Sequence, residues 1–259
     1  PFLSRKKAEF GVGIARMEDR YFQTNIIDFS ETKHDESTYS IFGGSIVLEG
    51  STLNARQFAT QGSREKMAAQ IFTGTEHFRS GVSKVTKDTP EPYKKVQSWL
   101  QVSYQNETYH KVSPKFTLGA YLEAYYSSRN FSNNYTATLM QAGEFTPTAH
   151  SKVTYNEAFR ANQYAGVGAI PIYQLSESFQ LRGEFYGFIP IFPIKKDEYG
   201  QAYYGKAFTK FEYLGEISLV FQLSFGSISA YVNHYSSPSN DWNVGLTLGW
   251  QLFNSRFIE

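Results

Sequence analysis

The sequence contains no cysteine among its 259 residues. It therefore has no disulfide framework, no thiolate metal site and no thiol nucleophile. It also lacks any apolar run near the roughly 18 residues that a membrane-spanning helix requires, which excludes a helical membrane protein. The formal net charge is only +1. This value argues against nucleic acid as a partner, because that kind of binding depends on a strongly basic surface.

A signal peptide is also missing, because no apolar stretch follows the first residues, Pro1 to Lys7. We therefore expect the chain to be a piece of a longer protein. Tryptophan is rare, with 3 residues, whereas tyrosine (19) and phenylalanine (22) are abundant. The mean hydropathy is −0.42, which is still compatible with a β-barrel in a membrane, because only alternate residues of such a barrel face lipid.

The segment from Trp242 to Phe253 alternates between apolar and small or polar residues. A β-strand turns successive side chains to opposite faces, so this segment predicts a strand with one apolar face and one face of glycine and amides. A soluble sandwich would bury the apolar face against a second sheet, whereas an outer-membrane barrel would turn it toward lipid.

Ten segments carry this alternation, and they cover residues 7–24, 37–49, 65–79, 94–108, 113–128, 162–175, 178–192, 210–224, 226–236 and 240–253. These segments run to about eleven residues or more, which is near the 9–11 residues that cross a bilayer at a tilt and longer than typical sandwich strands. The connections between them alternate between mostly tight and mostly long, which is typical of outer-membrane barrels. The sequence therefore predicts an all-β fold, an antiparallel transmembrane β-barrel over residues 1–259 with a long loop, at about 129–161, folded inward.

Three motifs resemble the sixteen-stranded BamA/TamA-type surface-antigen barrels. The segment from Asn54 to Arg64 is similar to the family's N-x-x-x-[FY]-P-T-x-G-x-[RS] turn, with Ala59 in place of proline. The segment from Phe159 to Asn162 stands where the family has V-R-G-[FY] on its inward-folded loop, although Ala161 replaces the glycine and Asn162 the aromatic residue. The last strand ends in the aromatic Phe253. The resemblance implies that the ten segments are the C-terminal ten strands of a sixteen-stranded barrel.

A closer resemblance is to the barrel of patatin-like phospholipases from Bacteroidota, and it covers nearly the whole chain. The matching phrases are residues 39–49 with 51–57, 145–152, 156–163, 169–173 and 252–256. The likeness implies a patatin-type hydrolase domain upstream of Pro1. The G-x-S-x-G and D-G-[GA] motifs of that hydrolase are absent from this chain, so we expect no catalytic residue here, and no cofactor.

The resemblance also implies structural roles for a few residues. Arg160 would lie inside the lumen as a lock, and Glu184 is its expected partner, because strand alternation turns Glu184 inward together with Gln180 and Arg182. Trp250, Leu252 and Phe253 would form the C-terminal assembly signal. The charged residues Glu123, Arg182, Glu184 and Glu216 are expected to line the lumen without catalysing a reaction.

Two further patterns concern the surface. Aromatic residues near the strand ends are expected to form a girdle at the level of the lipid headgroups; they are Tyr93, Tyr109, Tyr125, Tyr126, Phe179, Tyr203, Tyr204 and Tyr235. The five histidines show none of the spacings of a transition-metal site, so we expect no metal.

These observations favour one function and leave two alternatives open. The favoured one is an outer-membrane barrel of a Gram-negative bacterium that anchors or translocates an upstream patatin-like phospholipase domain. The alternatives are an assembly or secretion factor of the BamA/TamA type and a small self-contained porin-like barrel. The expected partners are outer-membrane lipid and lipopolysaccharide, the barrel assembly machinery and the upstream hydrolase domain. A homodimer stays open, and nucleic acid is not expected.

Overall fold

A computed structural model describes residues 5–21, 34–81, 92–132, 135–198, 200–223, 226–237 and 242–250. The fold is all-β, and ten strands form one antiparallel sheet in the order of the chain. These strands are β1 (Arg5–Tyr21), β2 (Asp35–Ser51), β3 (Gly62–Arg79), β4 (Tyr93–Lys111), β5 (Phe116–Ser127), β8 (Gln163–Gln174), β9 (Phe179–Pro190), β12 (Glu212–Leu223), β13 (Gly226–Tyr235) and β14 (Trp242–Trp250).

The remaining elements are short and lie in the connections. They are α1 (Tyr135–Gln141), β6 (Gly143–Glu144), the 3-10 helices η1 (Ser151–Val153) and η2 (Glu157–Phe159), β7 (Arg160–Ala161), β10 (Ile194–Lys196) and β11 (Ala202–Tyr204). Strand β6 pairs with β7, and β10 pairs with β11. Each of the ten segments predicted from the alternating pattern overlaps one strand of the large sheet, so the prediction of ten antiparallel strands is confirmed.

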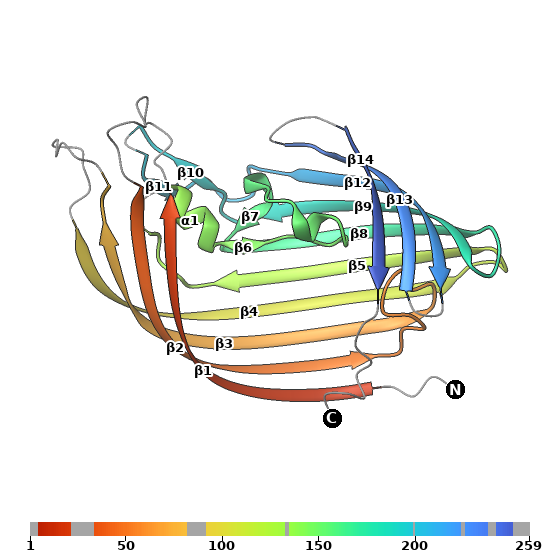
Figure 1. Cartoon of the computed structure of the whole chain (residues 1–259), viewed down its shortest axis with the longest axis horizontal. Helices are drawn as coiled ribbons and strands as arrows, with labels where there is room; N and C mark the ends of the chain where they lie inside the picture. The colour runs from red at the N-terminus through yellow and green to blue at the C-terminus, as the bar shows by residue number, and fades with distance from the viewer. Residues whose placement is uncertain are drawn as a thin grey trace.

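The large sheet is strongly curved and forms a trough (Figure 1). Between β5 and β8, residues 128–132 and 135–162 lie on the concave face of this trough and carry α1, β6 and β7; we call them the inner segment. Within the described residues, β1 pairs only with β2 and β14 only with β13, so both edges of the sheet are free.

Successive residues of each strand differ in burial because they point to opposite faces of the sheet. Strand β12 is the clearest case: Glu216 is 2% exposed, whereas the next residue, Ile217, is 48% exposed. The concave face is covered by the inner segment and by the connection between β2 and β3. On the convex face, by contrast, no described element of the chain covers the sheet (Figure 1).

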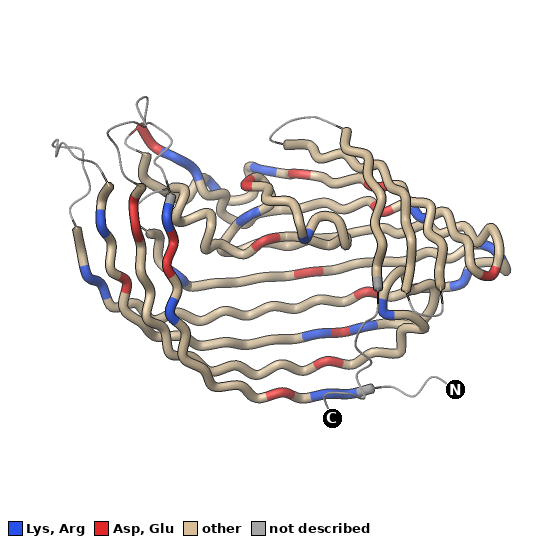
Figure 2. The backbone as a smooth tube through the Cα atoms, in the orientation of Figure 1, with Lys and Arg blue, Asp and Glu red and all other residues tan. Residues whose placement is uncertain are grey.

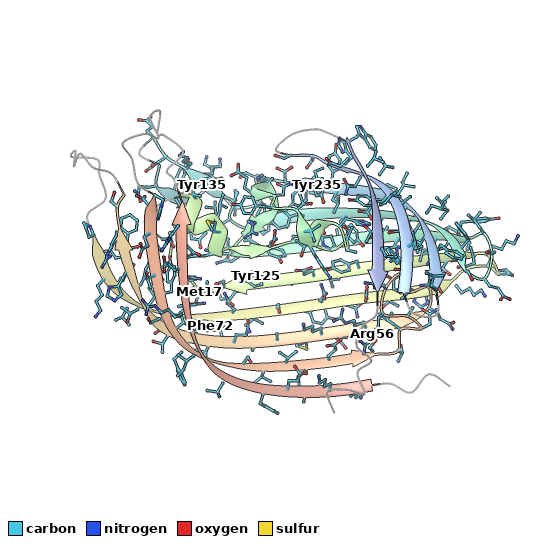
Figure 3. All side chains as sticks on the ribbon, viewed as in Figure 1. Met17, Arg56, Phe72, Tyr125, Tyr135 and Tyr235 are labelled. Atoms are coloured by element: carbon cyan, nitrogen blue, oxygen red, sulfur yellow. The ribbon has the colours of Figure 1, made fainter. Side chains whose placement is uncertain are left out.

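The buried apolar residues of the concave side form three clusters. The largest joins Phe145 and Phe159 of the inner segment to residues of β4, β5, β8, β9, β12 and β13. A second contains Tyr39, Ile41 and Trp99, and a third joins Leu139 of α1 to Ile194 of β10. Phe72, Tyr125 and Tyr235, which pack in or against these clusters, are labelled in Figure 3. The inner segment is thereby fixed to the sheet through aromatic contacts.

Candidate functional site

The first candidate site is the convex face, which is apolar across the sheet. Large apolar side chains point outward from every strand and stay exposed to an unusual degree, such as Val12 (79%) and Leu246 (82%). From β5 to β14, no described outward-facing side chain is Asp, Glu, Lys or Arg. Monomeric soluble proteins rarely expose an apolar area of this extent.

Charged residues bound this apolar surface along β1, β2 and β3. The strand register places Lys6, Gly50 and Glu65 in one outward-facing row near the start of β1. Four apolar rows follow: Ala8–Leu48–Met67, Phe10–Ile46–Ala69, Val12–Gly44–Ile71 and Ile14–Phe42–Thr73. Arg16 begins the next row, with Ser40 and Thr75, and charges recur beyond it. In Figure 2, the middles of β1 to β4 accordingly lack charge over long stretches.

We call the apolar rows between these two charged ends the apolar belt. The two charged residues that limit it on β1, Lys6 and Arg16, are ten positions apart (16 − 6). At about 3.4 Å per residue, this separation corresponds to about 34 Å along the strand.

The predicted aromatic girdle is wrong for half of its residues. Tyr126 and Phe179 do lie on the convex face. The concave face instead receives four of the predicted residues, Tyr93, Tyr109, Tyr125 and Tyr235. Each of them alternates along its strand with the residues that point to the convex face. Tyr109 and Tyr235 belong to the largest buried cluster, and the Tyr93 hydroxyl donates to the Glu76 carboxylate at 2.7 Å. Tyr203 and Tyr204 lie on β11, outside the large sheet.

The second candidate site is the concave face, which holds most of the buried charge. Glu76, Arg182, Glu184 and Glu216 are all nearly inaccessible to solvent. Each of them has a partner, as the cost of burying an unpaired charge requires. Glu76, for example, accepts hydrogen bonds from the Tyr39 hydroxyl at 3.1 Å and from the Gln97 amide at 2.6 Å. The inward orientation predicted for Arg182, Glu184 and Glu216 is confirmed.

The structure does not bring Arg160 and Glu184 together as predicted. Arg160 instead forms an ion pair with Glu144 at 2.8 Å, within the small β6–β7 sheet, and its guanidinium stacks over the Tyr155 ring at 4.7 Å. Glu184 pairs with Arg182, which lies two residues away on the same face of β9. Glu184 pairs with Arg182 because both residues lie on the same face of one strand. Arg160 pairs with Glu144 because the two residues lie directly opposite each other in the small β6–β7 sheet.

Arg182 also holds the connection between β2 and β3 against the far side of the sheet. Its guanidinium donates to the backbone carbonyl of Ala59 at 2.9 Å and to the Tyr109 hydroxyl at 2.7 Å. Two neighbouring glutamines do the same: Gln180 donates to the Phe58 carbonyl at 3.2 Å and Gln222 to the Gln57 carbonyl at 3.2 Å. Residues 52–61 therefore cross the concave face from β2 and β3 to β9 and β12; we call this segment the cross-bridge.

The conformation of the cross-bridge depends on particular residues. The Asn54 side chain accepts hydrogen bonds from the backbone amides of Thr60 and Gln61 at 3.0 and 3.1 Å. Gly62 closes the segment with a φ of +94°, and a Cβ atom there would lie 2.2 Å from the Thr52 carbonyl oxygen. Only glycine fits this position. Asn54 and Gly62 belong to the motif that resembles the surface-antigen turn.

A buried histidine joins the inner segment to the last strands. His150 Nδ1 lies 2.7 Å from Glu216 Oε1, and both side chains are nearly inaccessible. The imidazole stacks on the Tyr231 ring, with the ring centroids 3.5 Å apart. Tyr231 in turn covers Gly245 of β14, where a Cβ atom would lie 2.5 Å from the Tyr231 hydroxyl. No sequence pattern predicts this contact, because His150 lies in an irregular segment 66 residues from Glu216.

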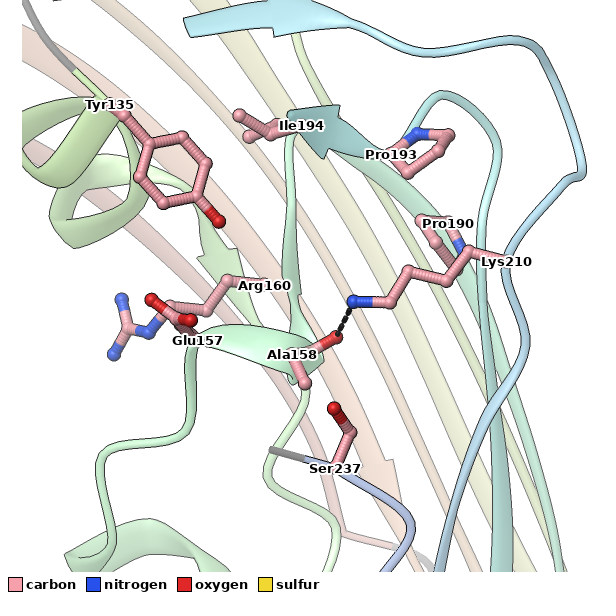
Figure 4. Close-up of a pocket in the computed structure, with 9 residues that line it drawn as sticks. All are labelled: Tyr135, Glu157, Ala158, Arg160, Pro190, Pro193, Ile194, Lys210 and Ser237. Atoms are coloured by element: carbon pink, nitrogen blue, oxygen red, sulfur yellow. Dashed lines mark hydrogen bonds between the residues drawn. The ribbon is translucent and has the colours of Figure 1, made fainter. Parts of the chain in front are cut away.

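A small cavity lies between the inner segment and the end of β9 (Figure 4). Its volume is about 70 Å³, room for several water molecules. Its two cationic lining residues already have carboxylate partners, since Arg160 pairs with Glu144 and Lys210 Nζ lies 3.3 Å from Glu212. Burial raises the pKa of Tyr135, which also lines the cavity, to about 12. The cavity therefore has no spare positive charge with which to hold an anion.

The predicted assembly signal falls mostly outside the described residues. Leu252 and Phe253 lie beyond them, and Trp250 is the last residue of β14, where its backbone lies opposite Gly226. No helix of the described ranges is long and apolar enough to cross a membrane. In the same ranges, no three His, Cys, Asp or Glu side chains are grouped so that they could hold a metal ion.

Comparison with known proteins gave no family assignment. No protein-family model matches the chain, and no curated protein or solved structure is similar enough to count as a match.

Proposed function

We propose that this chain is part of an outer-membrane β-barrel, with its convex face in lipid and its concave face toward a largely filled interior. The observation that carries the proposal is the polarity of the sheet, which is the reverse of that of a soluble protein. Charged groups are buried on the concave face, and large apolar side chains are exposed on the convex face. In water, this arrangement would leave the apolar belt without a favourable partner, whereas lipid is a matching solvent for it.

The height of the apolar belt supports this proposal quantitatively. Strands of outer-membrane barrels tilt by about 40°, and a length of about 34 Å along such a strand corresponds to about 26 Å along the membrane normal. The apolar band of known outer-membrane barrels is about 25 Å tall. The charged rows that begin at Lys6 and Arg16 would then lie at the two interfaces with water.

The lengths of the connections agree with the same orientation. At one end of the sheet, β4–β5, β8–β9 and β12–β13 are joined by residues 112–115, 175–178 and 224–225, and β2–β3 by the cross-bridge. At the other end, the connections are residues 22–34, 80–92, 128–162, 191–211 and 236–241. Short turns on the periplasmic side and long loops outside are the rule for bacterial barrels. We therefore propose that the end with the short turns faces the periplasm.

We further propose that the barrel anchors or translocates an upstream patatin-like phospholipase domain. The support is the resemblance of several phrases, among them residues 145–152 and 156–163, to the barrels of such phospholipases. The hydrolase would be held at the membrane surface, where its lipid substrates are. Two other functions remain candidates: an assembly or secretion factor of the surface-antigen superfamily, and a self-contained porin-like barrel.

Single cysteine substitutions test the membrane proposal, because the chain has no native cysteine. Leu100 and Gln101 are adjacent on β4 and point to opposite faces, so each can carry one spin label in protein reconstituted into vesicles. We expect the label at Leu100→Cys to collide with oxygen, which dissolves in lipid, and the label at Gln101→Cys with a water-soluble nickel complex. Equal access of the nickel complex to both labels, or a protein that stays in solution without detergent, would refute the proposal.

The intact mass of the native protein, with peptide mapping and a phospholipase assay, separates the three functions. A species much larger than 29.5 kDa with a G-x-S-x-G peptide and phospholipase activity is the expected result. Substitution of that motif's serine by alanine should abolish the activity and leave the barrel in the membrane. A large species with periplasmic modules and no hydrolase motif would indicate an assembly or secretion factor. A species near 29.5 kDa would indicate a self-contained barrel.

A further inference from the structure

A groove on the convex face crosses the rim of the apolar belt at β1, β2 and β3. Its volume is about 460 Å³, within the range of small-molecule sites. Its outward-facing lining residues are Lys6, Ala8, Leu48, Gly50, Glu65 and Met67. Lys7 and Glu49 also line it, but their side chains already have partners, Glu9 for Lys7 and Arg64 for Glu49. They belong to two neighbouring rows of the sheet, one with charges and one that is apolar.

The charged row has a gap in its centre. Lys6 and Glu65 flank Gly50, which has no side chain, and the space above Gly50 is open, because no atom lies within 4 Å of a Cβ placed there. The backbones that carry the two charges are two strand spacings apart, about 9.5 Å. Glu65 is held by the Tyr104 hydroxyl, which donates to its carboxylate at 2.9 Å. Lys6 makes no ion pair or hydrogen bond with any described residue.

The row beneath is apolar and continues into the belt. Ala8, Leu48 and Met67 lie side by side in this order, so the row has one small and two longer apolar side chains. Leu48 and Met67 are about half exposed. The groove therefore offers a hydrocarbon surface below and two opposite charges above, at the depth where a membrane changes from acyl chains to headgroups.

We propose that this groove binds a phospholipid whose headgroup carries both a phosphate and a primary ammonium group. Lys6 pairs with the phosphate, the Glu65 carboxylate accepts hydrogen bonds from the ammonium group, and one acyl chain lies along Ala8, Leu48 and Met67. The opposite charges of the two side chains match the opposite charges of such a headgroup. The site rests on the proposed position of the apolar belt in the membrane.

Native mass spectrometry of the whole protein in detergent tests the site, with phosphatidylethanolamine, phosphatidylglycerol and phosphatidylcholine as probes. We expect phosphatidylethanolamine to bind most tightly. Lys6→Gln should weaken the binding of all three lipids by a factor of about five, the upper range for an exposed ion pair. Glu65→Ala removes the oxygens that accept from the ammonium group, so it should abolish the preference for phosphatidylethanolamine over phosphatidylcholine, whose quaternary ammonium donates no N–H bond.

Gly50→Leu places a side chain in the groove at a position where no protein atom lies within 4 Å of the new Cβ, and it should remove the bound lipid. Gly44→Leu, three rows along the same face, and Lys94→Gln, near the opposite end of the sheet, serve as matched controls that should bind lipid as the native protein does. Equal binding of the three lipids, or unchanged binding to Gly50→Leu, would overturn the proposed site. If the labels at Leu100 and Gln101 still show insertion, the site alone fails; if they do not, the membrane proposal fails as well.

Discussion

The replacement of Arg182 by methionine should destabilise the protein more than any substitution of similar size on the convex face. Arg182 is 4% exposed and pairs with Glu184, which is 5% exposed. Its removal would leave the Glu184 carboxylate buried with the Tyr186 hydroxyl as its remaining hydrogen-bond donor. Breaking a buried ion pair by removing one partner costs about 3–5 kcal/mol. The Ala59 carbonyl would also lose its donor, which adds about 1 kcal/mol.

The free energy of unfolding of the protein in detergent micelles, measured by urea titration with tryptophan fluorescence, is the appropriate assay. Arg182→Met should lower it by about 4–6 kcal/mol. The double variant Arg182→Met/Glu184→Gln should recover part of this loss, because it no longer buries an uncompensated carboxylate. A loss below about 1 kcal/mol in the single variant, or strictly additive effects of the two substitutions, would refute this account of the pair.

Three further substitutions test other contacts of the concave face, with the same unfolding assay. Gly62→Ala should cost about 2 kcal/mol or more, because of its positive φ and the close Thr52 carbonyl, whereas Gly13→Ala, which has open space around it, should be nearly neutral. Phe145→Ala should cost about 3–5 kcal/mol, since the ring is buried in the largest cluster, and an unchanged stability would show that the inner segment is not packed there. His150→Ala should cost about 3 kcal/mol because it leaves Glu216 buried without its imidazole partner; a protein as stable as the native one would contradict the importance of this pair.

The strands and their phases were predictable from the sequence because each depends on a local pattern. In β12, the alternation of Ile217 and Leu219 with Glu216 and Ser218 fixes both the strand and the face that each side chain occupies. This information is contained in a few neighbouring residues, and the hydrogen bonding of a strand imposes the period of two.

The contacts across the interior were not predictable in the same way. Gln57 lies 170 residues from its partner Ser227, and nothing in the local pattern of either residue specifies the other. The predicted partner of Arg160 was wrong for a related reason. Strand phase correctly turned Glu184 to the concave face, but it carries no information on which of several inward-facing charges is nearest.

The aromatic residues show that the face to which a side chain points depends on strand alternation and not on its distance from the strand end. Tyr109 and Tyr235 lie near strand ends, where a girdle would be, yet their phase turns them into the buried cluster. A prediction that combined the distance from the strand end with the parity of each residue would have kept Tyr126 and Phe179 and rejected these two.

The two faces of the sheet contribute differently to the choice of one structure. If the convex face lies in lipid, its side chains contact hydrocarbon whether or not the neighbouring strand is correctly paired. They therefore contribute little to the free-energy difference between the native strand register and a shifted one. The concave face discriminates strongly, because a shifted strand would separate Arg182 from Ala59 or His150 from Glu216 and leave buried charges unpaired. We infer that the register and the curvature of the sheet are specified mainly from the inside, by the cross-bridge and the inner segment. Apolar exchanges on the convex face, such as Leu219→Ile, should therefore leave the structure unchanged. Substitutions of the adjacent inward-facing residues, Ser218 and Val220, should disturb it.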